Sequence, residues 1–254
     1  MAAERDNRMT RRWLVDAGVT DGMRVIEVGC GGGEVTQILA ELVGPSGSVV
    51  AFDRDQEALA IAHDRMRERR IEHVQFRSAD VAEECSTLES FQEESFDALA
   101  GRRVLMYLRN PAEVLRRLSG WLRSGGLVVF EETDSTMVPA RRSPMPAHDR
   151  ATQWLARMLA AEGANPAMGF DLPSTLAEAG LTFERIRAEA VIQGQGTQYP
   201  LRDLLGLLRS RLITAGVATQ AEVDALAAGL EAESLDRTSV YVSEMSFCAW
   251  GRKP

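Results

Sequence analysis

The sequence contains few cysteines, three in 254 residues, and these are Cys30, Cys85 and Cys248. They lie far apart and none belongs to a CxxC pair, which argues against a disulfide framework and against a zinc cluster. The sequence also lacks any run of about 18 uncharged apolar residues, and its charged beginning, MAAERDNRMTRRW, has no apolar core like that of a secretory signal. We therefore expect a cytoplasmic protein without a membrane span.

Positive charge is also in short supply. Lys and Arg number 29 against 37 Asp and Glu, which gives a formal net charge of −8 at pH 7. A negative surface repels the phosphate backbones of nucleic acids, so we expect no nucleic-acid partner and favour a small-molecule one. Glu131, Glu132 and Asp134 alone make a weak case for a metal site, and we expect no metal.

Short apolar runs alternate with segments of helical periodicity in the first half of the chain, which is the pattern of βαβ units. Five strands are predicted, at 23–28, 49–52, 74–76, 96–100 and 127–130. Asp55 is placed to cap the helix after the second strand, and Asn110-Pro111 to begin a helix that buries residues as far as Leu122. We predict an α/β fold: a Rossmann-like, seven-stranded, mostly parallel sheet with helices on both faces and helical cap insertions.

The pattern changes after the fifth strand, where prolines cluster between residues 133 and 182. Thr219 and Glu222 form a predicted capping box, and leucines between 201 and 212 line one helix face. Further elements are predicted as helices at 149–161 and 173–179 and strands at 183–192 and 240–250. We interpret the chain as one domain, 1–254, with a cofactor-binding core at 1–134, cap and acceptor insertions around a sixth strand at 135–235, and the last strand at 236–254.

A glycine-rich turn, 29–33, joins the first predicted strand to a helix. Such a turn lets a ligand approach the backbone and meet free helix N–H groups, although a plain tight turn has the same composition. Asp53 and Asp80 follow the next two strands, at the carboxyl edge where ligands bind in such sheets, and Asp53 is placed to accept ribose hydroxyls. The last position of a dinucleotide fingerprint falls on Glu34, which suits a pyrophosphate poorly. A nucleoside ligand of another kind is therefore favoured.

Four motifs together resemble class I S-adenosylmethionine-dependent methyltransferases, in particular the small-molecule branch that includes ubiquinone and menaquinone methyltransferases. In chain order they are VIEVGCGGG, VVAFDRD, FRSADV and FDALAGRRVLMYLRNPAEVLRRLSGWLRSGGLVVFEETD. The resemblance is colinear over about residues 20–134 and specific, because all four fall in the family's order and spacing. It implies S-adenosylmethionine as the cofactor.

The resemblance also implies a role for individual residues. The glycine turn would take the methionyl carboxylate, Glu27 would balance the positive methionyl part, and Asp53 would hold the ribose. Asp80 would bind the adenine amino group while Val81 packs on the ring. Ordinary structural roles are open for each of these side chains, as a helix cap, a turn cap or a strand-end charge. The implied cofactor residues are Glu27, Gly29, Cys30, Gly31, Gly33, Asp53, Arg54, Ala79, Asp80, Val81, Gly101 and Arg102.

Methyl transfer from a sulfonium requires alignment of donor and acceptor and exclusion of water, but no dedicated protein nucleophile. The motifs of amino-methylating nucleic-acid enzymes and of metal-dependent catechol enzymes are missing after the fourth strand. The net charge of −8 favours a small-molecule acceptor, and O-, N- and C-methylation are all open. His148 is the candidate base, with a polar helix start as the alternative. Tyr107 is a candidate substrate contact, with packing as its alternative.

The sequence is also compatible with other functions. The chain could methylate RNA or protein, or it could be a non-methylating S-adenosylmethionine-binding scaffold or a cyclase-like protein. The segment after residue 134 is predicted to form a lid over an apolar acceptor pocket, or alternatively a dimer interface. The protein is expected to be a monomer or a homodimer.

Overall fold

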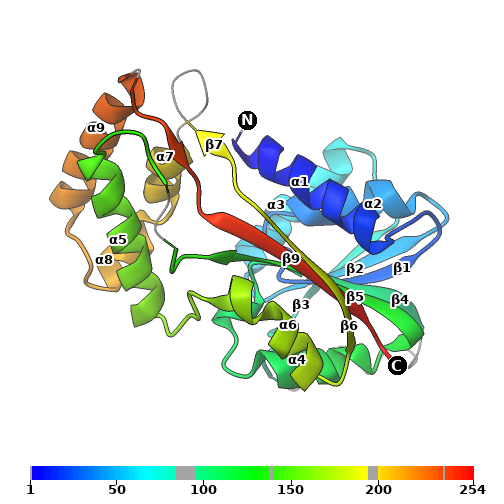
Figure 1. The fold of residues 1–254 in the computed structure, drawn as a ribbon. Coiled ribbons are helices and arrows are strands. Elements are labelled where there is room, and N and C mark those ends of the chain that lie inside the picture. Colours follow the sequence, from blue (N-terminus) through cyan, green and yellow to red (C-terminus); the bar gives the residue numbers. More distant parts are fainter. Residues whose placement is uncertain (1, 84–94, 138–139, 194–199, 237) are drawn as a thin grey trace.

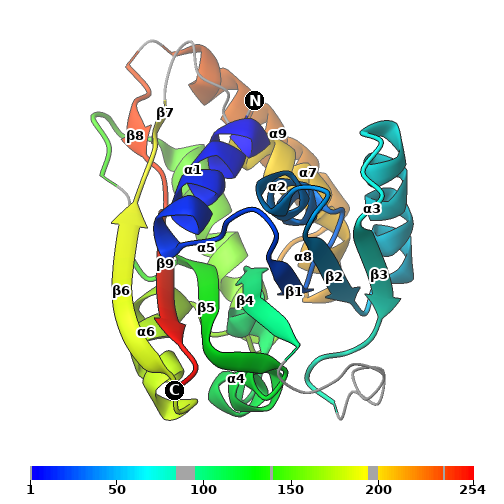
Figure 2. The same ribbon diagram turned by 90° about the vertical axis from the view of Figure 1, so that its right-hand side faces the viewer.

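The computed structural model describes residues 2–83, 95–137, 140–193, 200–236 and 238–254 (Figure 1). Cys85 lies outside the described residues. A seven-stranded sheet forms the centre, with the strand order β3-β2-β1-β4-β5-β9-β6, visible from edge to edge in Figure 2. The antiparallel strand is β9, and the others run parallel, as predicted. The strands are β1 (Arg24–Val28), β2 (Ser48–Asp53), β3 (Val74–Ser78), β4 (Phe96–Arg102), β5 (Leu122–Asp134), β6 (Thr182–Glu189) and β9 (Met245–Arg252).

Helices cover both faces of the sheet, as predicted (Figure 1). One face carries α1 (Ala2–Ala17), α2 (Glu34–Val43) and α3 (Gln56–Glu68), and the other carries α4 (Pro111–Ser119) and α6 (Met168–Glu178). Each face has its own apolar core, because the interior strands are buried on both sides. Asp55 caps α3 as predicted: its carboxylate accepts the N–H groups of Glu57 at 2.9 Å and Ala58 at 3.2 Å.

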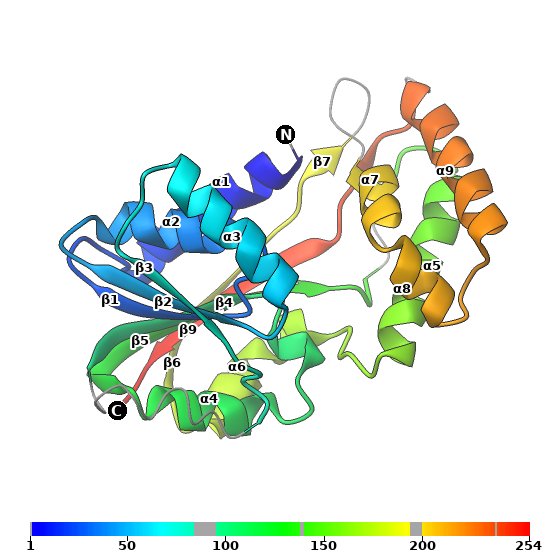
Figure 3. The ribbon, with the colours of Figure 1, turned by 180° about the vertical axis from the view of Figure 1, so that it is seen from behind.

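The remaining helices pack together as a cap beyond the end of the sheet at which β5 finishes (Figure 3). The capping box of Thr219 and Glu222 at the start of α9 is confirmed. The cap elements are α5 (Pro146–Ala161), α7 (Pro200–Leu207), α8 (Arg209–Thr214) and α9 (Gln220–Leu235), with a small antiparallel pair of β7 (Ile192–Gln193) and β8 (Tyr241–Val242) beside them. No helix within these described ranges is long and apolar enough to cross a lipid bilayer.

Several predicted boundaries were wrong. The helix α4 ends at Ser119, and Leu122, predicted on its buried face, begins β5 and pairs with Phe96. The single leucine-lined helix is two helices, α7 and α8, and the strand predicted at 183–192 ends at Glu189. The helix α6 starts at Met168, ahead of Pro173, and α1 was not predicted at all.

Candidate functional site

The glycine turn lies between β1 and α2. Gly29, Gly31 and Gly33 have φ angles of 67°, 49° and 80°, in the left-handed region that other residues rarely adopt. A Cβ at Gly29 would lie 2.2 Å from the Cγ2 atom of Val104, so the segment after β4 packs directly on the turn. A Cβ at Gly31 would meet nothing within 4 Å. The turn is therefore closely packed at Gly29 and accessible to a ligand at Gly31.

Asp53, the last residue of β2, holds this turn in place. Its Oδ2 accepts the N–H of Gly31 at 2.7 Å, and its Oδ1 accepts the N–H of Asp55 at 2.9 Å. The cap of α3 is Asp55 and not Asp53, so the helix-cap alternative for Asp53 does not apply. Each carboxylate oxygen keeps further lone-pair capacity, because an ionised carboxylate has about four acceptor sites. Asp53 can therefore support the turn and accept hydroxyl groups of a ligand together.

Asp80 lies across from Asp53, after β3. Its Oδ1 accepts the N–H of Ala82 at 2.9 Å, so it does cap a turn, and its Oδ2 lies 3.5 Å from an Arg54 nitrogen. A cavity of about 210 Å³ opens here, much larger than the roughly 30 Å³ that one water takes up. The cavity is lined by Gly29, Phe52, Asp53, Arg54, Ala79, Asp80, Val81, Ala82, Arg103, Val104, Tyr107 and Leu108.

Six of the cofactor residues implied by the sequence thus come together in one cavity, with Tyr107 on its other wall. The other implied residues lie outside the lining. Gly101 has a packing role, since a Cβ there would be 2.5 Å from the Phe130 ring. The Arg102 guanidinium donates to the Asn7 side chain at 3.1 Å and to the Thr10 hydroxyl at 3.0 Å, on α1. Cys30 is buried, and burial raises the pKa of its thiol, so it is uncharged.

Glu27 is the buried charge of the site. It lies in β1, is 1% exposed, and its Oε2 has no hydrogen-bond partner among the described residues. Burial raises its pKa to about 7, although the Thr36 hydroxyl and the Arg102 charge act in the opposite direction. A carboxylate removed from water in this way is stabilised by a positive group brought close to it.

Tyr107 marks the meeting point of the cavity and the cap. It belongs to a short 3₁₀ helix, η2 (Leu105–Tyr107), and is 44% exposed. Arg211 of α8 donates to the Tyr107 hydroxyl at 3.4 Å, and its guanidinium carbon lies 5.7 Å from the ring centroid. Glu162 accepts two hydrogen bonds from Arg211, at 2.9 and 2.5 Å, and so fixes its orientation. A cap residue is therefore held against the wall of the cavity.

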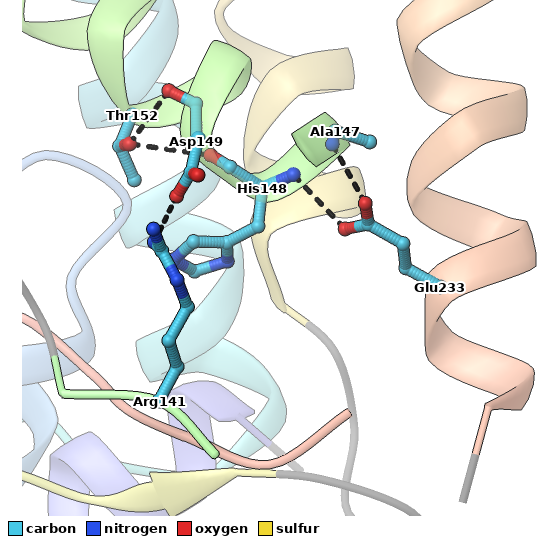
Figure 4. Close-up of polar contacts among 6 residues, drawn as sticks. All are labelled: Arg141, Ala147, His148, Asp149, Thr152 and Glu233. Atoms are coloured by element: carbon cyan, nitrogen blue, oxygen red, sulfur yellow. Dashed lines mark hydrogen bonds and ion pairs between the residues drawn. The ribbon is translucent and has the colours of Figure 1, made fainter. Parts of the chain in front are cut away.

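His148 occupies a different environment, in the first turn of α5 (Figure 4). Its backbone N–H donates to Glu233 at 3.0 Å, and its ring lies 4.3 Å, centroid to centroid, from that of Tyr241. Burial lowers the pKa of His148 to about 4, with Asp149 raising it and Arg141 lowering it, so the ring is neutral at pH 7. The residue is not part of the cavity lining, which agrees with the helix-start alternative.

The acidic cluster at the end of β5 serves separate segments. The Thr10 hydroxyl donates to Glu131 at 2.6 Å, the N–H of Leu105 donates to Glu132 at 2.7 Å, and that of Thr136 donates to Asp134 at 2.9 Å. In the part of the chain that the structure describes, no group of three or more His, Cys, Asp or Glu residues is placed to hold a metal ion.

Sequence reasoning missed two contributors to the site. One is the helix α1, which reaches Arg102 through Thr10; its buried Met9, Trp13 and Ala17, spaced four residues apart, are the pattern that would have revealed it. The other is Val104, which packs on Gly29 and lines the cavity. Its conformation depends on contacts with residues distant in sequence, so no local pattern indicates it.

These residues fit the chemistry of S-adenosylmethionine. Gly31 leaves open space beside the N-terminus of α2, and a helix N-terminus suits the carboxylate. The buried, unpartnered oxygen of Glu27 matches the ammonium, and Asp53 and Asp80 match the ribose hydroxyls and the adenine amino group. The apolar faces of Val81 and Leu108 border the same cavity.

Comparison with known proteins agrees with the geometry. A family model described as a methyltransferase domain matches residues 19–180. The ubiquinone/menaquinone biosynthesis C-methyltransferase UbiE of Ectopseudomonas mendocina is 31% identical over 128 residues, covering 49% of this chain and 48% of that protein. The arsenite methyltransferase of Aquipseudomonas alcaligenes is 34% identical over 123 residues, covering 47% of this chain and 35% of that protein. The chain thus matches less than half of the length of each of these curated relatives.

A solved structure shows the same fold over nearly the whole chain. A putative methyltransferase from Bacillus halodurans superposes with a TM-score of 0.63, covering 96% of this chain and 98% of that one at 16% identity. The chain therefore belongs to the class I S-adenosylmethionine-dependent methyltransferase family, resembles its quinone-methylating members, and has S-adenosylmethionine as its cofactor.

Proposed function

We propose that this chain transfers the methyl group of S-adenosylmethionine to an apolar small-molecule acceptor, bound between the cavity and the cap. The observation that carries the proposal is the construction of the cavity from two parts of the chain. The lining joins the two aspartates and Gly29 from the ends of β1 to β3 with Tyr107 from the segment after β4, and Arg211 of the cap contacts Tyr107 directly. Donor and acceptor would therefore meet at the boundary between sheet and cap.

The cofactor residues divide by chemical role. Asp53 would accept the ribose hydroxyls, Asp80 the adenine amino group, and Glu27 would balance the ammonium. Bound there, S-adenosylmethionine supplies an activated methyl carbon on a positive sulfur. The N-terminus of α2 and the backbone of the glycine turn would receive the carboxylate, in the manner of other helix-terminal anion sites.

The contribution of the protein to the reaction is positioning and exclusion of water. Tyr107 is the residue we place against the acceptor, because it lines the cavity and its hydroxyl is held by a cap arginine. His148 is a poor candidate for the base, since its ring is buried at the foot of the cap and its pKa of about 4 makes it only weakly basic.

The apolar character of the acceptor follows from what faces this region. Val104, Tyr107 and Leu108 supply an apolar wall. The cap helix α7 exposes the apolar side chains of Leu204 and Leu207, at 38% and 81%. Curated relatives named for quinone and arsenite methylation indicate small acceptors, and a net charge of −8 disfavours RNA.

The test is formation of S-adenosylhomocysteine by the purified protein with a panel of acceptors. The panel contains short-chain demethylated quinols, phenols, amines and arsenite, with total RNA and unfolded protein as competing substrates. Asp64→Asn, at an exposed position of α3, is the control for substitution of Asp53, because it also removes a carboxylate but lies away from the cavity lining. Turnover with quinols or phenols supports the proposal, and turnover confined to RNA or protein overturns it.

A further inference from the structure

The acidic end of β5 is not explained by cofactor binding or by a metal. Glu132 and Asp134 are both 0% exposed, and each has one carboxylate oxygen bonded to backbone N–H groups. The other oxygen of each has no hydrogen-bond partner within the described ranges. With Glu131, which is 4% exposed, β5 carries three buried carboxylates, and because buried carboxylates are costly they require a structural reason.

Glu132 builds the turn that follows β4. Its Oε1 accepts the N–H groups of Val104 at 2.9 Å and Leu105 at 2.7 Å, the first free donors of the 3₁₀ helix η2. Immediately before them, Arg103 has a φ of 58°, in the strained left-handed region, and its N–H donates to the Glu131 carbonyl at 2.8 Å. The neighbouring β5 residues thus force the chain to turn away from the sheet.

The position of this turn sets the width of the cavity. Val104 packs on Gly29 and lines the same cavity as Asp53 and Asp80. The backbone N–H of Tyr107 donates to the Val104 carbonyl at 3.0 Å, so the two residues are linked within one short turn. A displaced Val104 would carry Tyr107 with it.

We propose that Glu132 is a positioning residue that fixes the acceptor-side wall, Arg103–Tyr107, by accepting the N–H groups of Val104 and Leu105. The inference rests on the proposed function, because that function places the acceptor against this wall. If position 132 has no oxygen to accept these two hydrogen bonds, the wall loses its support. Asp53, Asp80 and the glycine turn are unchanged, so cofactor binding is retained. Glu132 therefore governs turnover and the KM of the acceptor more than the affinity for the cofactor.

The experiment compares Glu132→Gln, which keeps an acceptor oxygen, with Glu132→Leu, which removes it. Asp134→Asn and Asp134→Leu are the matched controls, since Asp134 is equally buried on the same strand but holds Thr136 instead. Glu132→Asp, which shortens the side chain, serves as the second disruptive variant if the leucine variant does not fold. Amide hydrogen exchange at Val104 and Leu105 is measured with S-adenosylhomocysteine bound, together with the calorimetric Kd of that ligand.

We expect Glu132→Leu to speed exchange at these two amides at least tenfold and to lower kcat/KM for the best panel acceptor about 10- to 100-fold, the scale of a 1 Å misplacement. The Kd for S-adenosylhomocysteine should change less than threefold, and Glu132→Gln should restore exchange and turnover to near wild type. Equal exchange in all variants, or unchanged kcat and KM in Glu132→Leu, overturns the inference. If the wild type methylates no panel acceptor, the proposed function fails, and the exchange comparison alone then decides the role of Glu132.

Discussion

The affinity for the cofactor should depend on pH through Glu27. This carboxyl is 1% exposed, its Oε2 has no hydrogen-bond partner in the described chain, and burial raises its pKa to about 7. The Thr36 hydroxyl and Arg102 lower that pKa, and Asp53 and Glu34 raise it. Above pH 7 the ionised carboxylate can balance the ammonium of the cofactor. Below pH 7 the added proton removes the charge, and the affinity falls.

The size of the effect follows from the titration of one group. If only the ionised form binds, the apparent Kd is multiplied by one plus the ratio of protonated to ionised carboxyl. For a pKa of about 7 this factor is about 11 at pH 6 and about 1.3 at pH 7.5, so the affinity should fall roughly eightfold between them. An ordinary α-amino group, with a pKa near 8, stays mostly protonated over this window. Calorimetric titration with S-adenosylhomocysteine at four pH values measures the change.

Two variants decide whether Glu27 is responsible. Glu27→Gln should bind more weakly at pH 7.5 and show no pH dependence between 6 and 7.5. Glu132→Gln should keep the eightfold change. Burial also raises the pKa of Glu132 to about 7, but this carboxylate is bonded to the N–H groups of Val104 and Leu105, whereas Glu27 lies in β1 just before the glycine turn. An eightfold change that survives in Glu27→Gln, or disappears in Glu132→Gln, would refute the reasoning.

Three further substitutions test other parts of the site. Asp53→Ala removes the acceptor for the ribose and for the Gly31 N–H. It should weaken cofactor binding about 10- to 100-fold, measured by calorimetry. An unchanged Kd would show that Asp53 does not bind the cofactor. Arg65 of α3 supports the glycine turn by donating to the Gly32 carbonyl at 2.7 Å. Arg65→Gln should therefore weaken cofactor binding about three- to tenfold and leave kcat at saturating cofactor unchanged. A fall in kcat with unchanged cofactor affinity would contradict this. His148→Ala removes a buried ring and should lower the free energy of unfolding by about 2 kcal/mol in urea titrations. The kcat should stay within twofold of wild type. A hundredfold fall in kcat would identify His148 as the base.

Most of the cofactor half of the molecule could be predicted because its signals are local. The strand β1 is a continuous buried run, the cap of α3 is a single aspartate, and the glycine turn and Asp53 each follow a strand directly. In a parallel sheet, residues at strand ends share one edge, so sequence order is enough to bring them together.

The parts that were missed depend on contacts between distant segments. The fifth strand was predicted at 127–130, but β5 begins at Leu122 and pairs with β4 on both sides of Gly125, whose φ is 73°. The wall at Arg103–Tyr107 takes its shape from Glu132, far along the chain, and no periodicity indicates it. Leu208, with a φ of −91° and a ψ of 4°, separates α7 from α8 within one uninterrupted leucine pattern, so the periodicity alone gives no sign of the break.

The chain builds its cap in two excursions, one after β5 and one between β6 and β9. Both leave and rejoin the sheet without altering the pairing of β1, β2 and β3, the strands whose ends carry the residues we propose to bind the methyl donor. On the proposed function, insertions or exchanges within these excursions can therefore reshape the acceptor compartment while the donor compartment stays the same. This modular connectivity gives evolution, and protein engineers, a way to change what is methylated without redesigning how the methyl donor is held.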